Sequence, residues 1–171
     1  IKIKPNNKDF LYNSLKIAAE NLCLSLDNNN IKVVRISNLY GNNFTNQSYI
    51  LPTWIKDSIN KKTISLLINK NSTKDYIFVD DAFDVILKII KKSKYRLYNI
   101  ASGKNIKLSK ILKEIKNCTN CKIRYKKNSK LIREPKINID RIKREFNFKV
   151  KNNLIDSISD LILDYKKKFK K

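Results

Sequence analysis

"FLYNSLKIAAENLCLSLDNNNIKVVRISNLYG", residues 10–41, decides the fold class of this chain. Its first half has apolar residues three and four positions apart, which predicts an amphipathic helix from Asp9 to about Leu26. These residues are Phe10, Leu11, Leu15, Ala18, Ala19, Leu22 and Leu26. The polar run DNNN ends the helix, and the β-branched run at 31–37 predicts a strand buried in a parallel sheet. A helix that leads into a buried strand is typical of an α/β fold.

The rest of the chain alternates between apolar runs and polar breaks, which predicts further helices and strands. We expect Asp80 or Asp81 to cap a helix that runs to about residue 92, and Asn147 to end a short helix in a left-handed conformation. Other helices are predicted at 51–60, 108–116, 140–146 and along the apolar face of Leu154, Ile155, Ile158, Leu161, Ile162, Tyr165 and Phe169. Strands are predicted at 63–68, 96–102 and 122–127, a turn at 69–74, and loops at 38–48 and 128–136.

The composition favours one globular, cytoplasmic protein. Of the 171 residues, 42% are apolar, and no stretch has the roughly 18 uninterrupted apolar residues of a membrane span. The chain has no histidine, which excludes catalytic triads and histidine metal sites within it. Cys118 and Cys121 form a single CxxC without further ligands, so we predict no metal site.

The net charge of +23 raises the possibility of nucleic-acid binding. The lysines are scattered along the whole chain, however, and no basic helix, zinc finger or aromatic RNA-binding signature is present. We therefore expect no nucleic-acid partner and no membrane partner, although a basic nucleic-acid-binding domain stays an alternative.

Glycine and methionine usage sets a further limit. The chain has no methionine and only two glycines, Gly41 and Gly103, so it cannot contain a glycine-rich phosphate loop. We expect it to be a piece of a longer protein.

Tyr12 and Lys16 are four residues apart and therefore share one face of the first predicted helix. An ammonium close to a phenol favours the ionised phenol, which makes it a better general base near neutral pH. A YxxxK spacing arises often by chance in a lysine-rich chain, so on its own it fits an ordinary amphipathic helix better than a catalytic pair.

Five blocks in a fixed order give this spacing its context. They are YNSLKIAAE, VVRISNLYG, KDYIFVDDAFDVI, LYNIASGKNIKLSKILKEI and INIDRIKREFNFKV. In this order the chain resembles the C-terminal half of the extended short-chain dehydrogenase/reductase family, the NAD-dependent nucleotide-sugar epimerases and dehydratases. The resemblance covers nearly all of the chain. It implies an oxidoreductase, isomerase or lyase that transfers hydride at a sugar carbon with NAD or NADP.

The resemblance also implies roles for individual residues. Tyr12 would be the catalytic acid/base at a sugar hydroxyl, and Lys16 would activate it and hold the nicotinamide ribose. The backbone of Ser37 would lie near the cofactor's carboxamide, which makes Tyr12, Lys16 and Ser37 the cofactor-binding set. Asn38 would contact the nucleotide-sugar substrate, although a residue of its type equally suits a turn at a strand end.

Two basic residues would bind the substrate diphosphate. Lys74 stands where many family members have an arginine, and it supplies charge without the two-pronged hydrogen bonding of a guanidinium. Arg133 is a second candidate, in the loop KLIREPK, where a solvated surface arginine is the alternative. The family pattern at Asp80 and Asp81 is also present, but we interpret both as helix caps.

The predicted fold is thus α/β: a partial Rossmann-type sheet without its N-terminal strands, and a smaller α+β substrate-binding domain. Residues 1–41 would belong to the dinucleotide-binding domain, and residues 42–171, starting near Asn42, mainly to the substrate-binding domain, with segments returning to the sheet. The 171 residues alone are expected to be inactive, and the full-length protein could form a homodimer. A non-catalytic nucleotide-sugar-binding relative remains an alternative.

Overall fold

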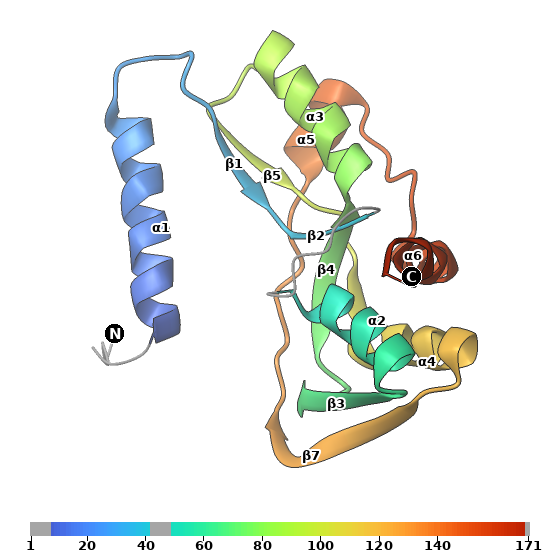
Figure 1. Ribbon diagram of the computed structural model, residues 1–171. Helices are drawn as coiled ribbons and strands as arrows, with labels where there is room; N and C mark the ends of the chain where they lie inside the picture. Colours follow the sequence, from blue (N-terminus) through green and yellow to red (C-terminus); the bar gives the residue numbers. More distant parts are fainter. Residues whose placement is uncertain (1–7, 42–48, 170–171) are drawn as a thin grey trace.

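A computed structural model describes residues 8–41 and 49–169 of the chain, which fold into helices and short, mostly parallel sheets (Figure 1). The elements follow in the order α1 (Lys8–Ser25), β1 (Val33–Ile36), β2 (Asn38–Tyr40), α2 (Ile50–Asn60), β3 (Thr63–Ile68), β4 (Thr73–Phe78), α3 (Val79–Lys92), β5 (Leu97–Ile100), β6 (Asn105–Lys107), α4 (Leu108–Thr119), β7 (Lys122–Lys130), α5 (Asp140–Phe146) and α6 (Leu154–Phe169).

Strand pairing brings together segments that are far apart in the sequence. β1 pairs in parallel with β5, with Val33 opposite Leu97. After Ser37 the same stretch continues as β2, which pairs in parallel with β4, and β4 pairs antiparallel with β6. β3 and β7 form a third, parallel pair. Ser37, the one residue between β1 and β2, therefore lies where two sheets meet.

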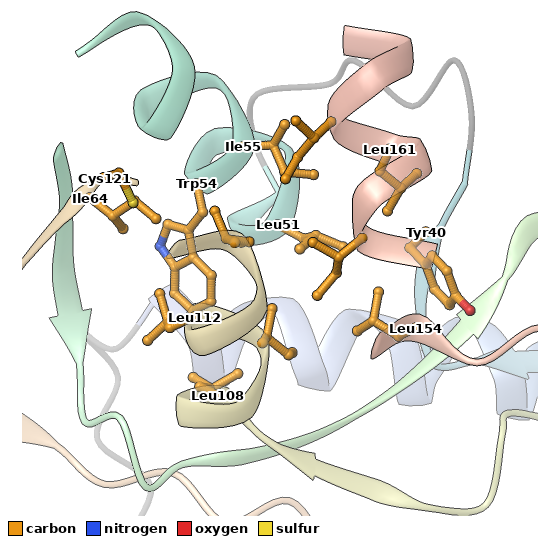
Figure 2. Close-up of a cluster of buried hydrophobic side chains, with 14 of the residues drawn as sticks. Tyr40, Leu51, Trp54, Ile55, Ile64, Leu108, Leu112, Cys121, Leu154 and Leu161 are labelled. Atoms are coloured by element: carbon orange, nitrogen blue, oxygen red, sulfur yellow. The ribbon is translucent and has the colours of Figure 1, made fainter. Parts of the chain in front are cut away.

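The first hydrophobic core lies between α2, α4 and α6 (Figure 2). Trp54 on α2 is 5% exposed and lies near Leu108 and Leu112 of α4, while Leu154 and Leu161 approach from α6. The apolar face predicted for the last helix is confirmed at Leu154, Ile158, Leu161 and Ile162, which are buried. The side chain of Phe169 lies outside the described residues.

The second core lies beneath α3 and α5, against β4 and β5. It contains Ile77, Tyr98, Ile100 and Ile142, each completely buried. Asn147, at the end of α5, has a φ of 50° and a ψ of 42°, which confirms the predicted left-handed residue. The two cores together fix β2, whose residues contribute to both.

Helix α1 lies to one side of the other elements (Figure 1). Its apolar residues Leu11, Leu15, Ile17 and Leu22 are 60–66% exposed. The predicted helix is confirmed, but these apolar side chains are left uncovered by the part of the chain that the structure describes.

The helices predicted from apolar periodicity are confirmed, with small shifts at their ends, and the α/β class is correct. Two short strands were missed. The predicted loop at 38–48 begins with β2, and β6 precedes α4. The predicted turn at 69–74 was also too long, because Thr73 and Lys74 already belong to β4. Strands of three residues have no period to detect and are defined by their distant partners.

The cap predicted at Asp80 or Asp81 was wrong. Phe78 precedes α3, and no side chain caps this helix. The Asp81 carboxylate is 2% exposed and instead accepts hydrogen bonds from the backbone N–H groups of Lys151 and Asn152, each at 3.1 Å. It ties the segment before α6 to α3, a contact that local sequence cannot reveal.

The division into domains stays a prediction, since Asn42 lies outside the described residues. Within residues 8–41 and 49–169, no helix is long and apolar enough to cross a lipid bilayer.

Candidate active site

A cavity of about 490 Å³ opens where β1 passes into β2. Its wall is formed by Tyr12, Ile36, Ser37, Asn38, Leu39, Tyr49, Glu134 and Ile137. Ser37 and Asn38 follow the carboxyl end of β1 directly. Open α/β sheets bind ligands outside the carboxyl ends of their strands, so this cavity is the candidate active site.

Tyr12 reaches the cavity from α1, and Lys16 lies beside it. The Lys16 Nζ is 5.5 Å from the centre of the Tyr12 ring, a distance at which an ammonium interacts with an aromatic ring. Tyr12 is 62% exposed, so its phenol is open to a ligand. Lys16 is exposed as well but does not line the cavity.

An ion pair attaches the middle of α1 to β1. The Arg35 Nε donates to the Glu20 Oε2 at 2.8 Å, and the Arg35 Nη2 donates to the other carboxylate oxygen. Such two-pronged pairing fixes the relative orientation of both groups. The hydrogen bond from Arg35 lowers the pKa of the Glu20 carboxyl, and the guanidinium charge contributes further.

A second arginine holds the C-terminal end of α1. Arg96 donates to the backbone carbonyls of Cys23 at 2.6 Å and Leu24 at 2.9 Å, and to Ile31 at 3.4 Å. The last carbonyls of a helix have no partner within the helix, and a cation there suits the helix dipole. Arg96 and Arg35 together set the direction in which α1 carries Tyr12 to the cavity.

A buried carboxylate organises the floor of the cavity. Asp75 on β4 is completely buried and accepts hydrogen bonds from the Ser37 hydroxyl at 2.9 Å, from the Ser102 N–H and hydroxyl at 2.9 Å, and from the Lys104 N–H at 3.0 Å. These donors satisfy a group that would otherwise be costly to bury. Asp75 therefore joins the β1–β2 junction to the turn after β5.

Ser37 and Asn38 both line the cavity, and both form hydrogen bonds to neighbouring strands. The Ser37 N–H donates to the Ile100 carbonyl at 3.0 Å, and the Asn38 Nδ2 donates to the Asp75 carbonyl at 2.8 Å. Asn38 is the first residue of β2 and pairs with Tyr76, so it lies in a strand and not in a turn.

Neither Lys74 nor Arg133 lines the cavity. The Lys74 Nζ lies 2.8 Å from the Glu134 Oε1, and Arg133 is exposed. Glu134 occupies the cavity wall instead. Glu134, Asp75 and the two arginines that hold α1 were not selected from the sequence as site residues, because each acts through partners distant along the chain.

A smaller hollow of about 150 Å³ adjoins the site and shares Asn38, Leu39 and Tyr49 with it. Its floor includes Tyr76, which is 6% exposed. Burial raises the pKa of the Tyr76 phenol, and the charge of Glu134 raises it further. Tyr76 therefore stays protonated at neutral pH.

Comparison with known proteins identifies similar sequences and folds. A sequence profile of the NAD dependent epimerase/dehydratase family matches residues 2–101. Among curated proteins, none matches the chain significantly.

Several solved structures have the same fold. A dTDP-glucose 4,6-dehydratase from Bacillus anthracis in complex with NAD is 21% identical, with a TM-score of 0.81 over 96% of this chain and 54% of that chain. RMD from Pseudomonas aeruginosa, complexed with NADPH, is 16% identical, with a TM-score of 0.79, and the match covers 96% of this chain and 60% of that chain. WbmF from Bordetella bronchiseptica, in complex with NAD+, is 22% identical, with a TM-score of 0.75, and the match covers 98% of this chain and 56% of that chain.

The chain spans about half the length of these proteins. The likeness confirms the predicted partial Rossmann-type α/β fold.

Proposed function

This chain belongs to the NAD dependent epimerase/dehydratase family, and on that premise we propose that it carries the catalytic pair of a nucleotide-sugar epimerase, dehydratase or reductase. The observation that carries the proposal is the placement of Tyr12. Its phenol lines the cavity at the carboxyl end of β1, with the Lys16 ammonium beside its ring.

Tyr12 would exchange a proton with a sugar hydroxyl. A hydroxyl that is being oxidised must lose its proton, and a positioned base at hydrogen-bond distance accelerates this transfer by about 10²- to 10⁴-fold. Lys16, whose ammonium lies beside the Tyr12 ring, would activate Tyr12 and would donate a hydrogen bond to the ribose of the cofactor. Ser37 and Asn38 would support the cofactor and the substrate at the floor of the cavity.

The residues present fit one end of a nicotinamide dinucleotide. An exposed ammonium and an exposed phenol lie on one helical face, above the polar residues at the end of β1. When bound, NAD or NADP accepts and returns a hydride. The pyrophosphate has no glycine-rich loop here, because the chain has only two glycines. We propose that the 171 residues alone are inactive.

The substrate would be a nucleotide sugar. A UDP-glucose 4-epimerase from Thermotoga maritima, solved with UDP-glucose, is 16% identical and shares the fold with a TM-score of 0.75. The diphosphate role stays a prediction for Arg133. For Lys74 it stands against a role in orienting Glu134, with which Lys74 is paired. Residues 1–41 would belong to the dinucleotide-binding domain and residues 42–171 mainly to the substrate-binding domain, with some segments returning to the Rossmann-type sheet. The uncovered apolar face of α1 agrees with a larger native assembly, either the cofactor domain or a homodimer.

The direct test uses the protein at its full native length. It would be incubated with NAD+ or NADP+ and with UDP-, dTDP- and GDP-linked hexoses, and the sugars followed by NMR. We expect a change at a ring carbon of at least one of these sugars. Absence of any turnover and of any binding across this set would contradict the proposal.

A further inference from the structure

Glu134 brings a negative charge into a cavity that is proposed to take a diphosphate-linked sugar. Its backbone is fixed on two sides: the Glu134 N–H donates to the Thr73 carbonyl at 3.3 Å, and the Glu134 carbonyl accepts from the Asn105 Nδ2 at 2.5 Å. Both neighbours belong to strands, β4 and β6, which fixes the backbone of Glu134 at the point where this residue lines the cavity.

Lys74 forms an ion pair with the Glu134 carboxylate. Its Nζ lies 2.8 Å from the Glu134 Oε1, and the two side chains are 15% and 31% exposed. Partial burial makes this contact less screened than a pair on the open surface. Glu134 lines the cavity, whereas Lys74 does not.

One carboxylate oxygen of Glu134 remains available. Within residues 8–41 and 49–169 no hydrogen bond reaches the Glu134 Oε2, while the Oε1 is bound to Lys74. An ionised carboxylate only accepts hydrogen bonds. It therefore suits the hydroxyl or amino groups of a sugar and opposes phosphates and carboxylates.

We infer that Glu134 selects the sugar: it accepts hydrogen bonds from neutral or amino sugars and rejects sugars that carry a carboxylate. This inference rests on the proposed function, because the same cavity contains Tyr12, which would act at the sugar ring. Lys74 is a positioning residue that orients the carboxylate. A binding site gains specificity as much from opposing the wrong ligand as from contacts with the right one.

The test compares nucleotide sugars that differ only in oxidation at C6. The pairs are UDP-glucose with UDP-glucuronate, dTDP-glucose with dTDP-glucuronate, and GDP-mannose with GDP-mannuronate, each titrated into the full native protein by calorimetry. We expect the neutral member of the bound pair to bind at least about tenfold more tightly, because two like charges would otherwise meet in the cavity. In Glu134→Gln this ratio should fall to about threefold or less. Glu114→Gln, on α4, is the matched control and should keep the ratio.

Lys74 variants separate positioning from direct phosphate binding. Lys74→Gln should lower the discrimination between the two sugars, and Lys74→Arg should restore most of it, while the affinity for the nucleoside diphosphate without a sugar stays within about twofold of wild type. If Lys74→Gln instead weakens nucleoside diphosphate binding about tenfold or more, Lys74 binds the diphosphate and the inference is overturned.

The failures are distinguishable. If a neutral sugar binds and Glu134→Gln leaves the ratio unchanged, the inference is wrong and the proposed function stands. If the uronate member binds more tightly to the wild type, the inference is also wrong. If no nucleotide sugar binds the wild-type protein, the proposed function and the inference fall together.

Discussion

The Ser37 hydroxyl lies 2.9 Å from the Asp75 carboxylate and donates a hydrogen bond to it, which joins the end of β1 to the middle of β4. Asp75 is completely buried, and its other donors come from the turn after β5. The cavity floor thus depends on one carboxylate that no ligand needs to touch.

Replacing the Asp75 carboxylate should lower the free energy of unfolding. Asp75→Ala leaves several buried donors without an acceptor, and each costs about 1–3 kcal/mol, so we expect the free energy of unfolding to fall by about 3 kcal/mol or more. Urea denaturation measures this. Asp160→Ala, at an exposed position on α6, is the control and should change stability by less than about 0.5 kcal/mol. A loss below about 1 kcal/mol for Asp75→Ala would contradict the structural role.

The anchoring of α1 by Arg96 can be tested by hydrogen exchange. Arg96→Ala removes three hydrogen bonds to the carbonyls of Cys23, Leu24 and Ile31. We expect faster amide exchange in the last turns of α1 and lower turnover, because Tyr12 is no longer held at the cavity. Arg144→Ala, at an exposed position on α5, should leave this exchange unchanged. Equal protection of α1 in wild type and Arg96→Ala would show that other contacts position the helix.

The pair formed by Glu20 and Arg35 gives a pH-dependent attachment. Because the pKa of Glu20 is lowered in the folded protein, its contribution to stability is fully present above the unfolded-state pKa, about 4.3, and is lost as pH falls through the folded-state pKa. A carboxyl NMR titration should show a Glu20 midpoint below the usual value. In Arg35→Gln the midpoint should return toward that value. An unshifted midpoint in the wild-type protein would mean that the ion pair does not persist in solution.

The isolated 171 residues should fail to bind the cofactor. Without a glycine-rich loop the pyrophosphate has no cradle, so we expect no saturable NAD binding up to millimolar concentrations. Calorimetry suits this test better than fluorescence, because Trp54 is buried in the first core. Saturable binding at micromolar NAD would contradict the expectation.

Sequence reasoning succeeded where a segment's structure is encoded within itself. The helices have apolar residues three and four apart, and Asn147 ends α5 in the conformation that its short polar side chain tolerates. The parallel pairing of β1 with β5 is as predicted from its β-branched run. The predicted burial of this strand is not seen, because its residues are half-buried or exposed among the residues that the structure describes.

The missed features depend on residues that meet only after folding. Asp75 takes its donors from residues 37, 102 and 104, and Asp81 takes its donors from residues 151 and 152. Glu134 is next to the predicted Arg133, but its pairing with Lys74 joins β4 to the segment after β7. No local pattern distinguishes such carboxylates from exposed ones.

The central claim is that the Tyr12 phenol transfers the proton, and kcat/KM of Tyr12→Phe in the full native protein tests it most directly. We expect a fall of about 10²-fold or more with nucleotide-sugar affinity kept, because the variant loses only the hydroxyl. Tyr125→Phe, at an exposed position on β7, should match wild type. Tyr12→Phe with kcat/KM within about threefold of wild type would contradict the claim.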